Sequence, residues 1–499
     1  SRDGFDMNMQ RTTPMFVFLM SASLAVIAFG CANTAENCEL IGMCGGKDAS
    51  SVGGMGGGGM GGAGGMAPDC QESLLTPLAV DRQSAENVHI APDGSLVMTG
   101  NYTGKLLLGP TTMLESAGPN PEFFLVRYGA DLTITKAFAM HAFLLDTAMN
   151  AAGKWVAVGT HAGAVVFPDK CGTLADTSGL FVAQFDAADK CVWAKSYALG
   201  PGTEVAAHVT MGTDGAIALA GGFSGTIAGL APTGALTSVG TKDVFVAKVD
   251  AAGSSLWAGS YGRAGQTQVA QAVALDAAGD VVIAGDYDGT LNFNDAKLGT
   301  MQSDHHVGFA AKFAGSGMSV SWQKSFVMDS GTQHITAMAL SGNNEVIVAG
   351  DINGTSSPDK LEETHRLFLA KLGLLDGTMT PVKAYAGSGA PMIHDIAVTP
   401  DGRIVLTGHL DDKLDFGDGE LGAAMAGERF YWTIVDKDGA NSQSRSAGDA
   451  PTGEKRGLGI AVDAMHAFVV GHFEGTMSLA GQSRTSGDMD IFAAKLCLP

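Results

Sequence analysis

Charged residues are scarce in this 499-residue sequence, and basic residues are scarcer than acidic ones. Only 16% of the residues are charged, and 30 Lys and Arg stand against 51 Asp and Glu, so the net charge is −21. A strongly acidic surface repels phosphate groups. The composition therefore argues against nucleic acid as a partner and against direct binding to anionic lipid headgroups.

The common motifs of catalysis are also missing. The chain has no GxSxG, HExxH or GxxxxGK[ST] segment. None of its cysteines has the CxxC spacing typical of zinc sites. We therefore favour a non-enzymatic binding module, with an enzyme (a lyase or hydrolase) and a purely structural surface protein as the alternatives.

Glycine is abundant, and one glycine-containing phrase recurs along the chain. It reads GSLVMTGNYTGKLLLG from Gly94 and GDVVIAGDYDGTLNF from Gly279. The shared glycine falls at Gly100, Gly159, Gly221, Gly285, Gly350, Gly408 and Gly471, with spacings of 59, 62, 64, 65, 58 and 63. A nearly fixed period is the signature of a repeat architecture.

Each unit contains four short apolar runs separated by Gly and Asp turns, and none has a convincing amphipathic helix pattern. Four antiparallel strands per unit describe a propeller blade, because packed blades cover each other's faces and leave only short edges. Residues 73–499 divide into seven units of 61 residues (427/7). The sequence predicts an all-β, seven-bladed β-propeller of four-stranded antiparallel blades.

The last unit ends at Pro499 before a fourth strand, whereas residues 73–80 form an apolar segment ahead of the first unit. We expect this segment to supply the outer strand of the seventh blade, antiparallel to residues 491–496. Antiparallel pairing would bring Cys70 close to Cys497, where a disulfide would lock the ring.

The runs DVFVAKVDAAG (Asp243 to Gly253) and WAK (Trp193 to Lys195) resemble the bacterial beta-propeller repeat of the SBBP type. The resemblance covers nearly all of residues 73–499. It implies an exported or surface-associated propeller, usually without assigned chemistry. The layout of a tether followed by a propeller is also similar to that of many predicted myxobacterial surface proteins.

The N-terminus has the layout of a secretory signal peptide. One basic residue, Arg11, precedes a mostly apolar run that ends at Gly30, before Cys31. Residues 1–30 are therefore interpreted as a signal peptide with upstream residues. Gly30 and Cys31 resemble the lipobox of bacterial lipoproteins, which implies lipidation of Cys31 and a place at the outer membrane or cell surface. Residues 31–72, rich in Gly and Met, are expected to be a disordered, flexible tether.

Six cysteines remain if Cys31 carries lipid, and an even number in an exported chain predicts disulfides. The sequence does not choose among the connectivities. The disulfide candidates are Cys38, Cys44, Cys70, Cys171, Cys191 and Cys497.

Equivalent positions of the repeat form rings around a propeller axis. The residue after the shared glycine is Asn101, Thr160, Gly222, Asp286, Asp351, His409 and His472. Two Asp and two His in neighbouring units suit a divalent metal. Asp286, Asp351, His409 and His472 are therefore candidate ligands, against the alternative that they are solvated residues at strand ends.

His305 and His306 are expected in an exposed loop. We expect no other cofactor, a monomer, and an unidentified protein or glycan ligand, with membrane contact only through the lipid anchor.

Overall fold

The computed structural model describes residues 72–498 except 76–77, 80, 109–111, 117, 168–170, 176, 294–299, 327–330, 343, 354–365, 423–426, 441, 449–452 and 480. The chain divides into two units, 1–64 and 65–499, and every described residue belongs to the second. The predicted signal peptide, the lipidation residue Cys31, the tether, and Cys38, Cys44 and Cys70 lie outside the described residues.

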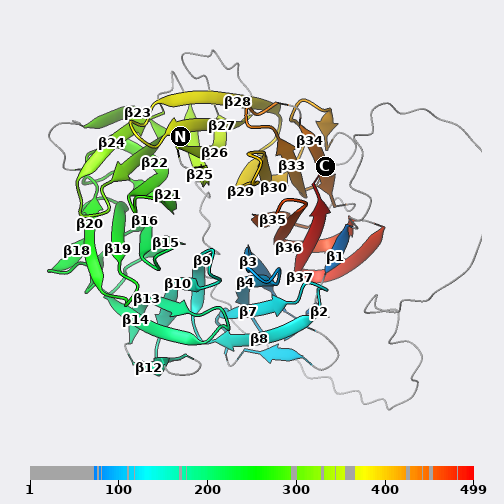
Figure 1. Cartoon of the computed structure of the whole chain (residues 1–499), viewed down its shortest axis with the longest axis horizontal. Coiled ribbons are helices and arrows are strands. Elements are labelled where there is room, and N and C mark those ends of the chain that lie inside the picture. The colour runs from blue at the N-terminus through cyan, green and yellow to red at the C-terminus, as the bar shows by residue number, and fades with distance from the viewer. Residues whose placement is uncertain are drawn as a thin grey trace, which may run out of the picture. The chain divides into compact units, whose positions relative to one another are not determined.

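The described part of the chain contains 37 strands and no helix, so the all-β prediction is confirmed. No helix among these residues has the length and apolar character needed to cross a bilayer. Most of the strands form seven successive antiparallel sets of four, which we call blades 1 to 7. Figure 1 shows the blades arranged around a central axis, with the first strand of each blade innermost.

The innermost, first strands are β3 (Gln83–Ile90), β9 (Phe143–Met149), β15 (Val205–Met211), β21 (Gln268–Leu275), β25 (Thr332–Ser341), β29 (Met392–Val398) and β35 (Lys455–Val462). The second strands are β4 (Leu96–Tyr102), β10 (Trp155–Ala162), β16 (Ile217–Phe223), β22 (Val281–Leu291), β26 (Glu345–Asn353), β30 (Ile404–Leu410) and β36 (His466–Leu479).

The third strands are β7 (Glu122–Tyr128), β13 (Ser178–Phe185), β19 (Asp243–Val249), β23 (Met301–Phe313), β27 (Arg366–Gly373), β33 (Arg429–Val435) and β37 (Gln482–Cys497). The outer, fourth strands are β8 (Ile134–Met140), β14 (Cys191–Leu199), β20 (Ser255–Tyr261), β24 (Val320–Ser325), β28 (Met379–Gly387), β34 (Gln443–Ala447) and β1 (Ser73–Leu75).

Short strands between the second and third strands add small hairpins to several blades. These strands, with β2 from the N-terminal segment, are β2 (Leu78–Ala79), β5 (Lys105–Leu107), β6 (Met113–Glu115), β11 (Val165–Val166), β12 (Thr173–Leu174), β17 (Thr226–Ala228), β18 (Ala235–Thr237), β31 (Leu414–Asp415) and β32 (Glu420–Leu421). Strand β17 pairs with β14 of the preceding blade, and β31 pairs with β28 in the same way. The second apolar run of the repeated phrase, which forms β17 and β31, therefore pairs each of these hairpins with the outer strand of the preceding blade.

The shared glycine lies on the second strand of each blade, where the inner strand approaches closely. A Cβ at Gly221 would lie 1.9 Å from the carbonyl oxygen of Ala206, and one at Gly350 would lie 1.8 Å from that of His334. In six of the seven blades the register with the inner strand also shifts at or next to this glycine. The phrase recurs because only a residue without a Cβ fits beside that carbonyl.

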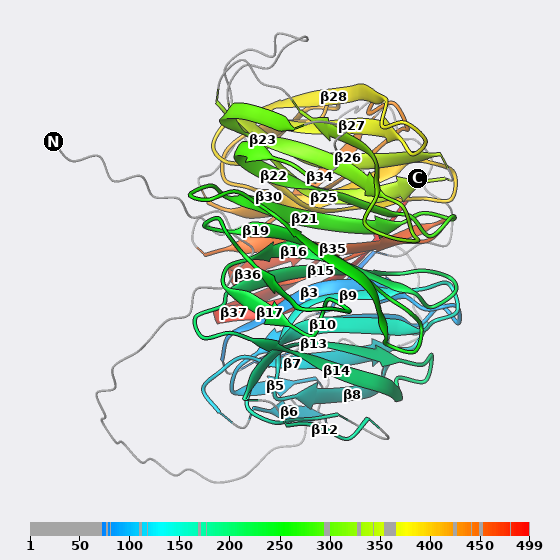
Figure 2. The same cartoon turned by 90° about the vertical axis from the view of Figure 1, so that its left-hand side faces the viewer.

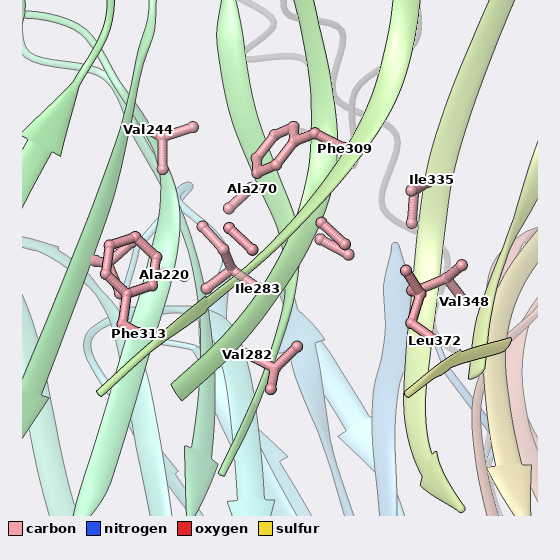
Figure 3. Packing of buried hydrophobic residues seen from close by; sticks show 14 of the residues in the cluster. Ala220, Val244, Ala270, Val282, Ile283, Phe309, Phe313, Ile335, Val348 and Leu372 are labelled. Atoms are coloured by element: carbon pink, nitrogen blue, oxygen red, sulfur yellow. The ribbon is translucent and has the colours of Figure 1, made fainter. Parts of the chain in front are cut away.

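The core lies between blades. Strands β16 and β19 are buried at every position, as expected for sheets that neighbouring blades cover on both faces. Figure 3 shows Val244 of blade 3, Ile283 of blade 4 and Ile335 of blade 5, which belong to one buried cluster. Continuous apolar runs such as DVFVAKV are thus explained by burial on both faces.

The Trp of the repeat also joins neighbouring blades. The indole N–H of Trp193 donates to the carbonyl oxygen of Ala251 at 3.0 Å, and that of Trp322 donates to Leu374 at 3.1 Å. Each acceptor lies in the turn between the third and fourth strands of the next blade. The motif residue therefore has a structural role here.

The N-terminal segment closes the ring. Strand β1 pairs antiparallel with β37, with Ser73 opposite Lys495 and Leu75 opposite Ala493, so this part of the closure prediction is confirmed. The prediction is wrong for the end of the segment, because Leu78–Ala79 pair with β5 of blade 1. The segment thus completes blade 7 and pairs with the hairpin of blade 1. Strand β14 has the same two roles, because it is the outer strand of blade 2 and pairs with β17 of blade 3.

The structure contains the disulfide Cys171–Cys191, with the two Cα atoms 5.7 Å apart. Cys497 is also disulfide-bonded, but the partner predicted for it, Cys70, lies outside the described residues.

Candidate functional site

The two ends of the ring carry different connections. The antiparallel order within each blade places the turns between strands one and two, and between strands three and four, at one end, which we call the turn end. The second-to-third connections and the crossovers to the next blade lie at the opposite end, the crossover end. In the side view of Figure 2 the strands run across the thickness of the ring, and loops emerge at both ends.

The ring position after the shared glycine lies in the half of the second strand toward the crossover end in blades 1, 2, 3, 5 and 6. In the longer second strands, Asp286 is at the midpoint of β22 and His472 is the seventh of the 14 residues of β36. In blades 1, 4 and 7 the side chain at the ring position contacts the inner strand of the next blade. Asn101 of blade 1 donates through Nδ2 to the carbonyl oxygen of Leu144 at 3.0 Å and accepts from the Leu144 N–H at 2.8 Å. In blade 3 the same position is Gly222, where a Cβ would meet Val269 of blade 4.

Asp286 occupies this position in blade 4 and is buried. Its Oδ1 accepts the backbone N–H of Ile335 on the inner strand of blade 5 at 2.7 Å. Its Oδ2 lies 3.6 Å from Nδ1 of His334 and 4.0 Å from Nε2 of His306. The two imidazole rings are 4.6 Å apart between centroids.

Asp286, His306 and His334, which we call the boundary group, each offer one ligand atom, and these atoms lie within 4.8 Å of one another. This is the only group of three or more His, Cys, Asp or Glu able to share a metal ion among the residues that the structure describes. Asp286 is the one predicted ligand that belongs to it.

The other three predicted ligands have different surroundings. Asp351 lies opposite His334 in the strand pairing, and its buried Oδ1 has no hydrogen-bond partner among the described residues. His409 Nδ1 is 2.8 Å from Nε2 of His394. His472 Nδ1 is 3.0 Å from Oγ of Ser84, and its Nε2 is 3.6 Å from a Glu454 oxygen.

The expectation of an exposed loop at His305–His306 is wrong. Both residues belong to strand β23 and are half-buried. Three residues, Asp304 to His306, stand opposite the single residue Asp288 in the pairing of β22 with β23. This bulge carries β23 toward blade 5, where His306 forms a parallel bridge with Thr332. Bulges commonly re-aim side chains in this way.

Burial and charge shift the pKa values of these groups. Burial lowers the pKa of His306, with the nearby Asp286 opposing this effect. Burial also disfavours the charged form of His334, but the carboxylates of Asp286 and Asp351 outweigh it and raise the pKa of His334. Burial raises the pKa of Asp351 to about 6, against the favourable charge of His334.

The blade 6–7 boundary holds further ionisable groups. Arg456 donates to both oxygens of Glu428, at 2.6 and 3.2 Å, and also lies 3.6 Å from Glu454. Burial lowers the pKa of His409 to about 4. The interaction of Glu454 with His472 lowers the pKa of that carboxyl to about 2.

No family model matches the chain, and no curated protein matches it. Among solved structures the chain resembles the polysaccharide lyase Uly1, with a TM-score of 0.45 and 9% identity over 83% of this chain and 90% of that one. It also resembles a protein of unknown function from Dyadobacter fermentans, with a TM-score of 0.42 and 11% identity over 85% and 98% of the two chains. A third likeness, to virginiamycin B lyase from Staphylococcus aureus, has a TM-score of 0.41 and 10% identity over 86% and 100%.

These likenesses say nothing of the ligand or activity of this chain. The propeller fold rests on the strand pairing itself. The sequence pattern placed His306 in an exposed loop, and it did not identify His334, which lies on an inner strand and not at the position after the shared glycine. On the inner strand, the residue that pairs with the ring position is Ser84 in blade 1, Val269 in blade 4, His334 in blade 5 and Arg456 in blade 7. Comparing this second position between the units would have identified His334.

Proposed function

We propose that this chain is an exported lipoprotein whose propeller binds a protein or glycan ligand at the crossover end. The observation that carries the proposal is the change of the ring position around the axis. It is neutral in blades 1 to 3 (Asn101, Thr160 and Gly222) and ionisable in blades 4 to 7. The scaffold needs no charge there, and burying ionisable groups is unfavourable unless a partner or function compensates.

An open hollow lies on blade 4, next to the bulge that follows the ring residue Asp286. It has a volume of about 360 Å³ and is lined by Gly289, Thr290, Gln302, Ser303 and Asp304 at the base of the β22–β23 hairpin. Its hydroxyl, amide and carboxylate groups can donate and accept hydrogen bonds. A ligand rich in hydroxyl or amide groups suits this lining.

Export is supported by the signal-like segment ending at Cys31 and by the disulfide Cys171–Cys191, since disulfides persist in oxidising compartments. In the proposed arrangement, which follows the SBBP-type and myxobacterial resemblance, residues 31–72 tether the propeller to the outer membrane or cell surface. Ser73, the first residue after the proposed tether, begins the outermost strand of blade 7. The protein acts as a monomer and contacts the membrane only through its lipid.

The binding proposal is tested by blocking one end of the ring at a time. Gln302→Cys near the crossover end and Leu375→Cys at the turn end are each labelled with a bulky maleimide; Gln302 is exposed and Leu375 is 91% exposed. Unlabelled and labelled proteins are applied to arrays of immobilised glycans and of surface proteins. We expect the label at position 302 to abolish binding and the label at position 375 to leave it unchanged. Equal binding by both labelled forms would contradict the proposal.

The anchor is tested separately. Cys31→Ser should abolish labelling with a fatty-acid analogue and release the protein into the soluble exported fraction. Unchanged labelling and membrane fractionation of this variant would exclude the anchor.

A further inference from the structure

We infer that the boundary group, Asp286, His306 and His334, binds a divalent transition-metal ion between blades 4 and 5. None of the residues that line the hollow belongs to this site, which is defined by the geometry of three side chains. Two imidazoles and one carboxylate suit Zn²⁺ and related ions. Ca²⁺ and Mg²⁺ prefer sets made only of oxygen ligands, so the group does not favour them.

The spacing of the side chains fits such an ion. A tetrahedral ion with bonds of about 2.0–2.2 Å keeps its ligand atoms about 3.4 Å apart. Oδ2 of Asp286 lies 3.6 Å from Nδ1 of His334 and 4.0 Å from Nε2 of His306. Side-chain movements of well under 1 Å would therefore bring these two pairs to metal-binding distances, and all three ligand atoms already lie within 4.8 Å of one another.

The carboxylate is already held in place. The N–H of Ile335 donates to Oδ1 of Asp286 at 2.7 Å, which leaves Oδ2 directed at the two imidazoles. Nε2 of Gln271 lies 3.4 Å from Oδ2. Hydrogen bonds of this kind orient a ligand before the ion arrives and so strengthen binding.

The site is buried on the carboxylate side and open on the histidine side. The side chain of Asp286 is 5% exposed, whereas those of His306 and His334 are 26% and 22% exposed. An ion can therefore enter past the histidines. Three protein ligands also leave a fourth position of a tetrahedral ion free for water or an exogenous ligand.

The fold builds the same bridge at one other boundary, between blades 3 and 4, where the described residues include no such set of metal ligands. The bridge between His306 and Thr332 has a counterpart one boundary earlier, between Lys242 and Thr267. There the ring position is Gly222 and its neighbour on the next inner strand is Val269. The scaffold therefore does not need two histidines and a carboxylate at this place, which favours a bound ion as their role.

A bound ion would connect two blades, because Asp286 and His306 belong to blade 4 and His334 belongs to blade 5. Binding to the folded state alone would raise the stability of the ring. Metal removal should then lower the unfolding temperature even where no ligand is present.

The test uses the full chain without a histidine tag, stripped of metal with EDTA and titrated with ZnCl₂ by calorimetry. We expect the wild-type chain to bind one Zn²⁺, and Asp286→Asn and His334→Ala to bind it at least about 100-fold more weakly. The matched control is His305→Ala, because His305 lies beside His306 on the same bulge but outside the boundary group. Its affinity should equal that of the wild type.

Urea unfolding of each metal-free variant shows whether it still folds. Should the buried Asp286→Asn variant fail to fold, His306→Gln at a half-buried position replaces it, and the same loss of affinity is expected. Zinc should raise the unfolding midpoint of the wild type and of His305→Ala only. The inference is overturned if the wild-type chain takes up no Zn²⁺, or if binding survives these substitutions unchanged.

Discussion

Replacing Gly221 by Ala tests why the repeated phrase keeps its glycine. A Cβ at this position would lie 1.9 Å from the carbonyl oxygen of Ala206 and 2.9 Å from Cε1 of Phe245. Both contacts are shorter than the 3.0 Å below which real Cβ atoms are essentially never found. The inner strand β15 would therefore have to move away by at least 3.0 − 1.9 = 1.1 Å.

Such a movement breaks neighbouring ladder hydrogen bonds, because an N–O distance near 2.9 Å would grow to about 4 Å. Two lost bonds at about 1 kcal/mol each and about 1–3 kcal/mol of overpacking give a destabilisation of about 3–5 kcal/mol. Urea unfolding followed by tryptophan fluorescence measures it.

The matched control is Gly317→Ala, since a Cβ there would meet nothing within 4 Å. We expect this change to stay within about 0.5 kcal/mol of the wild type. A destabilisation below about 1 kcal/mol for Gly221→Ala would refute the close-approach explanation of the phrase.

Three further predictions address the charge, covalent links and closure of the ring. The folded-state pKa of His409 is about 4, below the unfolded value of 6.5, so the unfolded chain binds the extra proton and stability falls as the pH drops from about 6.5 to 4. The free energy of unfolding of His409→Asn should fall by about 3 kcal/mol less than that of the wild type over this pH range. Urea unfolding of both proteins at each pH measures the difference, and parallel pH profiles would refute the prediction. Replacing Cys171 and Cys191 by Ala should cost about 3 kcal/mol for a separation of 20 residues, whereas an unchanged urea midpoint would contradict a stabilising role. A truncation that removes residues 1–75, and with them β1, should be about 2–3 kcal/mol less stable than one that removes only residues 1–71. It should also form dimers, because the edge of β37 is exposed. Identical light scattering by the two truncated proteins would exclude this role of β1.

The sequence alone determined the architecture, because a blade is a local pattern. The near-constant spacing of glycines such as Gly221 and Gly285 predicted the repeat, and four apolar runs between Gly and Asp turns predicted four strands. Ring closure was also predictable, since the last unit lacks a fourth strand and the segment from Ser73 supplies one. The end of that segment was not predictable, because its pairing with β5 depends on how blade 1 lies beside blade 7.

The boundary group was decided only by the tertiary structure. The repeat identified Asp286, but His306 and His334 follow it by 20 and 48 residues and belong to a different strand and a different blade. His306 reaches Asp286 through a bulge that sets three residues opposite one, and His334 reaches it through the packing of blade 5 on blade 4. Strand periodicity predicts neither, since it specifies which residues alternate along one strand but not where a register shift falls or what the next blade presents.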